Sequence, residues 1–164
     1  PYDRYYISVD YGTVNPTSMG LWGRASGKWY RMREYYFDSR KEGRQRTDEE
    51  HYFELERLAG DLPIRAVIVD PSAASFIETI RRHGRFYVEK ASNSVLDGIR
   101  DVATRLQSGD IFFCECCTDC IREFGLYRWD EKAPMDRPIK ENDHAMDDVR
   151  YFVHKIFAPE IFSF

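Results

Sequence analysis

Hydrophobic and polar residues alternate along the first part of the chain, a pattern typical of β-strands. The alternation predicts a strand over residues 5–10 that ends on Asp10. Residues 17–24 and 28–38 are predicted to form two more strands, because Ala25-Ser-Gly27 between them is a hairpin signal. We therefore expect three consecutive antiparallel strands at the start of the fold.

Helical periodicity and strand-like runs alternate in the rest of the chain. The capping-box sequence Thr47-Asp-Glu-Glu50 predicts a helix that runs to about Ala59. The apolar run of residues 65–69 predicts a buried strand that ends on Asp70, and a helix is expected directly after it, with Pro71 in the first turn. The later elements are expected to be short strands over residues 86–89 and 111–113 and helices over residues 94–107, 118–127 and 144–157.

This order of elements predicts an α/β fold in which three antiparallel strands and then parallel strands form one mixed sheet flanked by helices. Residues 38–46 read as a polar loop, and residues 129–142, with Pro134 and Pro138, read as an irregular connection. Since no repeat or linker divides the chain, we expect a single domain over residues 1–164.

Length and charge narrow the class of protein. The 164 residues are enough to bury a core, and the formal charge of −4 argues against non-specific adhesion to nucleic acid through bulk charge. No apolar run approaches the roughly 20 residues that a membrane-spanning helix needs. No signal-peptide pattern opens the chain, and Pro1 in place of methionine suggests a fragment of a longer protein.

All four cysteines fall within the short stretch Cys114-Glu-Cys-Cys-Thr-Asp-Cys120. Two overlapping C-x-x-C spacings are compatible with a zinc site. Structural zinc sites, however, usually take ligand pairs from separated segments, which one short stretch does not provide. We therefore expect reduced thiols between a strand end and a helix start, in a cytosolic compartment.

The last predicted helix has two contrasting faces. Its polar face carries His144, Asp147 and Tyr151 at positions i, i+3 and i+7, with Asp148 at the margin. Taken alone, such a face is more often solvated than catalytic. The apolar stripe on the other side consists of Ala145, Met146, Val149, Phe152, Val153 and Ile156.

Three carboxylates on separate rigid elements change that interpretation. Asp10 and Asp70 end buried strands and Asp147 lies on a helix, and convergent acids of this kind hold the ions of metal-dependent phosphodiesterases. Clustered carboxylates repel one another, so a cation is their natural counter-ion, and hard oxygen ligands suit Mg²⁺ or Mn²⁺, with two ions expected. His144 is expected to join a metal or to assist proton transfer, and Asp148 is an alternative ligand.

Several motifs follow one another in an order that covers nearly the whole chain. They are Val9-Asp-Tyr-Gly-Thr13 with Asn15-Pro16, Val69-Asp-Pro-Ser-Ala-Ala-Ser-Phe76, Asn93 with Val95-Leu-Asp-Gly-Ile-Arg100, Ile121-Arg-Glu-Phe124, Trp129-Asp-Glu-Lys132, and Pro138-Ile-Lys-Glu-Asn-Asp-His-Ala-Met-Asp147. Together they resemble the C-terminal nuclease domain of tailed-phage terminase large subunits, in the ribonuclease-H-like superfamily. The resemblance places the family's metal-binding aspartates on Asp10, Asp70 and Asp147 and its histidine on His144. Where the family often has a small residue, this chain has Asp148.

The resemblance implies a divalent-metal-dependent endodeoxyribonuclease that cuts concatemeric double-stranded DNA when packaging begins and ends. It would act in the host cell cytoplasm rather than in the mature virion. Terminases also carry an N-terminal packaging ATPase, but no G-x-x-x-x-G-K-[ST] motif is present, so the chain looks like the excised nuclease half. The small subunit and the portal would be partners of the full-length protein, and the isolated domain is expected to be monomeric, with no membrane role.

Local basic residues are candidate contacts for the DNA backbone, although each could equally be solvated. They are Arg40, Lys41, Arg44, Arg46, Lys132 and Lys140. No recognition helix or zinc finger is evident, so sequence-specific readout is not expected.

Other functions fit part of the pattern. The turn after Asp10 also resembles the phosphate-binding turn of actin-like ATPases and sugar kinases, which would need a second D-x-G motif and a longer chain. A junction-resolving nuclease is closer in chemistry but would lack the later terminase-like motifs. A packaging-complex module that binds DNA or the portal without cutting is the non-enzymatic alternative, which metal-dependent nicking of plasmid would distinguish.

Overall fold

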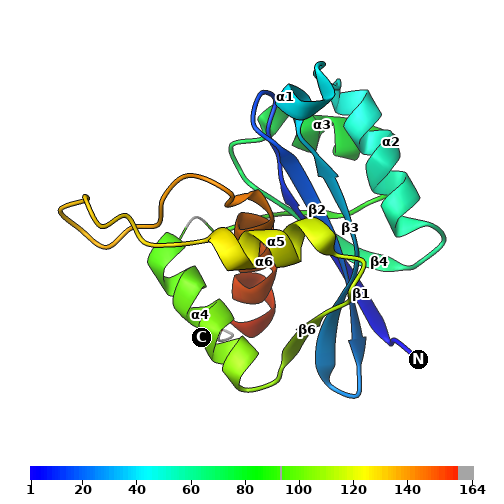
Figure 1. The fold of residues 1–164 in the computed structure, drawn as a ribbon. Helices are drawn as coiled ribbons and strands as arrows, with labels where there is room; N and C mark the ends of the chain where they lie inside the picture. Colours follow the sequence, from blue (N-terminus) through cyan, green and yellow to red (C-terminus); the bar gives the residue numbers. More distant parts are fainter. Residues whose placement is uncertain (93, 159–164) are drawn as a thin grey trace, which may run out of the picture.

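A computed structural model describes residues 1–92 and 94–158 of the chain (Figure 1). The elements are β1 (Arg4–Asp10), β2 (Thr17–Ala25), β3 (Lys28–Phe37), α1 (Ser39–Glu42), α2 (Asp48–Ala59), β4 (Ile64–Val69), α3 (Ala74–His83), β5 (Val88–Lys90), α4 (Val95–Gln107), β6 (Ile111–Phe113), α5 (Thr118–Leu126) and α6 (His144–Phe157). Asn93, which belongs to one of the motifs above, lies outside the described residues.

One six-stranded sheet organises the fold, in the order β5-β4-β1-β2-β3-β6. Strands β1, β2 and β3 form an antiparallel meander. Strand β4 pairs in parallel with β1, β5 with β4, and β6 with β3. The mixed sheet expected from the sequence is therefore confirmed.

Helices cover both faces of this sheet, with α2 and α3 on one side and α4, α5 and α6 on the other (Figure 1). Side-chain alternation along β1 assigns its residues to the two layers. Ile7 and Val9 pack against α2 and α3, whereas Tyr6 faces α6 and contacts the ring of Phe152. Ser8 and Asp10 consequently point toward the α6 side.

Local hydrogen bonds shift some elements from their expected places. Helix α3 begins at Ala74 rather than directly after Asp70, because the Asp70 carboxylate accepts hydrogen bonds from the amide and hydroxyl of Ser72 and forms a turn. Residues 39–42 of the expected polar loop form the short helix α1, whose N-terminus the Asp38 side chain caps. Strand β5 covers residues 88–90 instead of 86–89.

The amphipathic helices α4 and α6 differ in how far they are buried. The apolar stripe of α6 is the core of its layer, and Val149, Phe152 and Val153 are fully buried. Helix α4 covers the sheet less completely, and its Leu106 is 39% exposed. None of the helices in the described part of the chain is both long enough and apolar enough to cross a lipid bilayer.

Candidate active site

The carboxyl ends of two neighbouring parallel strands place Asp10 and Asp70 at the same edge of the sheet. Val9 pairs with Val69, and the Asp70 amide donates to the Val9 carbonyl oxygen at 3.4 Å. Strand ends of this kind are where open α/β sheets place their ligands. Helix α6 begins over this edge, so its first turn adds His144 and Asp147.

All four side chains line one surface pocket of about 270 Å³. The structure therefore brings together the residues that the sequence analysis singled out for the site. The full lining is Asp10, Tyr11, Gly12, Asn15, Pro16, Asp70, Lys140, Asp143, His144 and Asp147.

Asp10 and His144 form the central contact of the pocket, with Oδ2 of Asp10 lying 3.1 Å from Nδ1 of His144. Burial raises the pKa of Asp10 to about 7; the hydrogen bond to His144 opposes this rise and the nearby Asp147 adds to it. Burial lowers the pKa of His144, but the hydrogen bond and the charge of Asp10 outweigh it, so the net shift is upward. The pair can therefore hold a proton near neutral pH.

The other two acids each have a protein partner. Asp70 accepts from the amide of Ser72 at 3.0 Å and from its hydroxyl at 2.9 Å. Oδ1 of Asp147 accepts from Nη2 of Arg150 at 3.1 Å. Burial raises the pKa of Asp147 to about 6, and Arg150 opposes the rise. Within residues 1–92 and 94–158, no group of three or more His, Cys, Asp or Glu side chains stands close enough to form a metal-binding cluster.

Asp148 takes no part in the pocket. It is fully buried between α6 and the sheet, where both of its oxygens accept hydrogen bonds from Arg31. The hydroxyls of Ser8 and Ser18 donate to the same two oxygens at 2.8 and 2.5 Å. Of the two adjacent aspartates, the geometry therefore favours Asp147 as the ligand.

Two further acids shape the site. Asp143 is the residue before α6, but its side chain caps no amide; it lines the pocket and lies 3.6 Å from Nε2 of His144. Asp143 was not among the predicted site residues, although it lies four residues before Asp147, a spacing that places two side chains on the same face of a helix.

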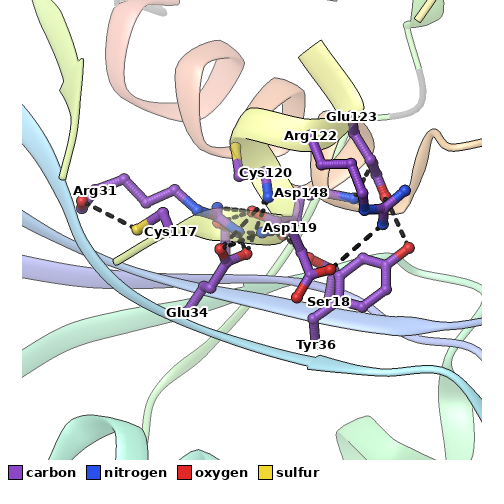
Figure 2. Close-up of polar contacts among 12 residues, drawn as sticks. Ser18, Arg31, Glu34, Tyr36, Cys117, Asp119, Cys120, Arg122, Glu123 and Asp148 are labelled. Carbon is purple, nitrogen blue, oxygen red and sulfur yellow. Dashed lines mark hydrogen bonds and ion pairs between the residues drawn. The ribbon is translucent and has the colours of Figure 1, made fainter. Parts of the chain in front are cut away.

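The cap of α6 comes from α5 instead, through Glu123, whose contact with Tyr36 is shown in Figure 2. Oε1 of Glu123 accepts from the amides of Ala145 at 2.8 Å and Met146 at 3.2 Å, and Oε2 accepts from the Tyr36 hydroxyl at 2.8 Å. Because Glu123 is far from α6 in the sequence, no local sequence pattern predicts that it caps this helix.

The candidate DNA contacts divide into three groups. Arg40, Lys41 and Lys140 line a second pocket of about 610 Å³, and this pocket has four lining residues in common with the first: Asn15, Pro16, Lys140 and His144. Arg44 instead pairs with Glu50 at 3.0 Å, and Arg46 with Glu54 at 3.5 Å. Lys132 is exposed and lines neither pocket.

The four cysteines are free thiols; Cys114, Cys116 and Cys117 lie between β6 and α5, and Cys120 lies in the first turn of α5. Cys117 and Cys120 are buried, Cys116 is exposed, and Cys114 is partly exposed. The stretch packs against β3, where the Cys117 thiol donates to the carbonyl oxygen of Arg31 at 3.4 Å.

No family model matches the chain, but individual proteins do. The terminase large subunit of Escherichia phage T5 is 24% identical over 157 residues, which is 92% of this chain and 35% of that protein. The large terminase of a thermophilic bacteriophage, solved in complex with ADP, is 50% identical, with a TM-score of 0.94 over 97% of this chain and 41% of that one. The chain thus spans less than half the length of either relative.

A nuclease domain solved on its own shares the fold over most of its length. The g2p large-terminase nuclease domain of bacteriophage SPP1, solved with bound Mn, has a TM-score of 0.67 at 20% identity, over 95% of this chain and 88% of that one. The six-stranded mixed sheet is thus the ribonuclease-H-like sheet of these domains. The relatives found by sequence and by structure are phage large terminases or their nuclease domains, and in fold and extent this chain fits the C-terminal nuclease domain of such a protein.

Proposed function

We propose that the chain is a divalent-metal-dependent endodeoxyribonuclease that cuts concatemeric double-stranded DNA when viral genome packaging begins and ends. The observation that carries this proposal is the meeting of Asp10, Asp70, Asp147 and His144 at one open pocket. They come from the ends of two strands and the start of a helix, which are rigid positions suited to a catalytic site. The resemblance to a nuclease domain solved with bound Mn supports the same chemistry.

The donor set fits a divalent cation. Carboxylate oxygens are the ligands that Mg²⁺ and Mn²⁺ prefer. The raised pKa values of Asp10 and Asp147, about 7 and about 6, are those of buried acids whose charge is incompletely neutralised. Asp10, Asp70 and Asp147 would hold one or two ions, with His144 at the edge of the set. Bound ions would neutralise charge on the attacking and leaving oxygens of the phosphodiester.

The remaining polar groups of the pocket have roles of their own. His144 can hold a proton at Nδ1 against Asp10, and it is the group that we assign to proton transfer. Lys140 lines both pockets and carries a positive charge suited to a DNA phosphate beside the acids. Double-stranded DNA is the proposed substrate of the chain, and the terminase small subunit and the portal are proposed partners of the whole protein, in the host cell cytoplasm.

A packaging module that binds DNA or the portal without cutting is the second candidate. Its support is that each carboxylate already has a protein partner, and that no cluster ready to bind metal stands in the described ranges. The two candidates differ in whether the chain breaks a phosphodiester bond.

Cleavage of supercoiled plasmid in Mg²⁺ or Mn²⁺, with and without EDTA, separates these candidates. Wild-type protein should nick or linearise plasmid in either metal and lose the activity in EDTA. Asp70→Asn should abolish Mn²⁺-supported cleavage while leaving the circular dichroism spectrum unchanged. Asp61→Asn, an exposed aspartate outside the pocket, is the matched control and should cut normally. Full activity of Asp70→Asn would sink the assignment of the site, and an inert wild type would favour the non-cutting module.

A further inference from the structure

The fully buried ion pair beneath the pocket joins β3 to α6 (Figure 2). Nη2 of Arg31 donates to Oδ2 of Asp148 at 3.0 Å, and Nη1 donates to Oδ1. Both side chains are 0% exposed. Two parallel hydrogen bonds of this kind fix the orientation of a carboxylate as well as its position.

The same carboxylate is also tied to the strands that flank Asp10. Ser8, which donates to Oδ1, lies two residues before Asp10 on the same face of β1. Ser18, which donates to Oδ2, is the β2 residue directly opposite Asp10. Since Asp148 follows Asp147, the network connects the strand that carries one site acid to the helix that carries another.

The sheet is shaped to hold the guanidinium. A Cβ atom at Gly20 would overlap the head group of Arg31, so β2 leaves room for it there. The Trp22 ring lies 5.6 Å from the guanidinium carbon and stacks on Phe152 of α6 at 4.0 Å. The Arg31–Asp148 ion pair is therefore closely packed between β2, β3 and α6.

Stability alone accounts poorly for this arrangement. Desolvating two charges is costly, and apolar residues of similar volume often replace a buried ion pair without loss of stability. Nε of Arg31 is also buried without a hydrogen-bond partner among the described residues. Apolar contacts, however, lack the two-point direction that fixes how a helix is rotated on a sheet.

We infer that Arg31 is a positioning residue of the candidate active site. Through Asp148 it fixes the first turn of α6 on the sheet, so that His144 and Asp147 stand beside Asp10. The inference rests on the proposed function, because the placement of these groups matters for holding a divalent ion. Partners that hydrogen-bond metal ligands directly commonly change metal affinity by about 10- to 100-fold, and this range sets the scale for the effect expected of Arg31.

Arg31→Lys tests the inference, because lysine keeps the buried charge but cannot donate two parallel hydrogen bonds. Titration followed by the electron paramagnetic resonance signal of free Mn²⁺ should show Mn²⁺ binding weakened about tenfold or more. Plasmid cleavage should need correspondingly more Mn²⁺ and recover toward the wild-type rate when the metal saturates. Amide hydrogen exchange should accelerate in residues 144–150 and stay unchanged in α2 and α3.

Two further proteins complete the experiment. The double variant Arg31→Met/Asp148→Leu removes both charges and replaces Arg31→Lys in the experiment if Arg31→Lys does not fold. It should show the same weakening of Mn²⁺ binding and the same faster amide exchange in residues 144–150. Ile80→Val, in the core on the other side of the sheet, controls for a general loss of stability and should leave Mn²⁺ affinity unchanged.

Two outcomes would overturn the positioning role: a folded Arg31 variant with wild-type Mn²⁺ affinity and wild-type exchange in α6, or losses that Ile80→Val reproduces. Failure of the proposed function looks different, because the wild-type protein would then neither bind Mn²⁺ nor cut plasmid. Amide exchange would still decide in that case whether Arg31 fixes α6.

Discussion

At the scale of single residues, the adjacent aspartates of α6 perform different tasks. Asp147 faces the pocket, where burial raises its pKa to about 6. Asp148 is buried more completely, yet the guanidinium of Arg31 neutralises it. Charge that is left incompletely neutralised at a pocket is available to a ligand, whereas charge that is paired in the core is committed to the fold.

Replacing each aspartate by asparagine should separate these tasks. Asp147→Asn should lower Mn²⁺-supported plasmid cleavage by about 10- to 100-fold or more with little loss of stability. Asp148→Asn should lower the free energy of unfolding by up to about 3–5 kcal/mol, because it leaves the buried charge of Arg31 with only the longer contact to Glu34, at 3.7 Å. Urea unfolding and plasmid cleavage of both variants provide the measurements. The reverse pattern would show that Asp148 is the ligand.

His51 gives the protein a dependence of stability on pH that is independent of the site. Burial lowers its pKa from 6.5 to about 4, and the nearby Arg46 contributes. The folded protein therefore binds fewer protons than the unfolded chain between these values, so stability that is present above pH 6.5 is lost as the pH falls toward 4. Wild-type protein should lose about 1–3 kcal/mol more than His51→Gln over this range. Urea unfolding at several pH values measures this difference. If the free energy of unfolding changed equally with pH in the wild type and in His51→Gln, the assignment to His51 would be wrong.

At the scale of elements, local signals were sufficient where an element is specified by its own residues. The capping box at Thr47 and the apolar stripe of α6 predicted helices that the structure confirms. The predicted start of α3, directly after Asp70, was wrong because a turn made by the Asp70 side chain precedes the helix. The cap that Glu123 gives α6 and the pairing of Asp148 with Arg31 could not be predicted, since both join segments distant in the sequence.

Packing between α4 and α6 depends on a glycine. A Cβ atom at Gly98 would overlap the side-chain stem of Arg150, which reaches past it to the carbonyl oxygen of Ser94 at 3.3 Å. Gly98→Ala should therefore destabilise the protein by about 1–3 kcal/mol, although alanine is the better helix former. Gly125→Ala in α5, where a Cβ meets nothing within 4 Å, should instead stabilise by up to about 1 kcal/mol. Thermal unfolding of the two variants measures both effects, and a stabilised Gly98→Ala would contradict this packing.

At the scale of the whole molecule, the topology assembles a site from acids far apart in the sequence. The order of strands and helices was enough to predict that Asp10, Asp70 and a residue of α6 meet, because parallel strand ends share an edge. The distribution of positive charge was harder to predict. Arg44 and Arg46 looked equivalent to Arg40, but side chains of α2 neutralise them in the folded protein.

The basic residues beside the site should therefore contribute unequally to DNA binding. Arg40, Lys41 and Lys140 line the large pocket next to the acids, although Asp38, Glu42 and Glu141 line it too. Changing the three cations to glutamine should weaken binding to a labelled DNA duplex, measured by fluorescence anisotropy without divalent metal. The slope of the logarithm of affinity against the logarithm of salt concentration should become shallower by about one for each phosphate that the variant no longer neutralises.

The matched control for this experiment is Arg44→Gln, which removes a cation that is already paired with Glu50. A net charge of −4 makes local geometry decisive, because the protein as a whole repels DNA and only correctly placed cations can offset that repulsion. Arg44→Gln should consequently leave both the affinity and the salt slope unchanged. A loss in the control of about one third of the loss in the triple variant, in proportion to the charges removed, would mean that DNA responds to the total charge of the molecule and that the pocket beside the acids is not its path.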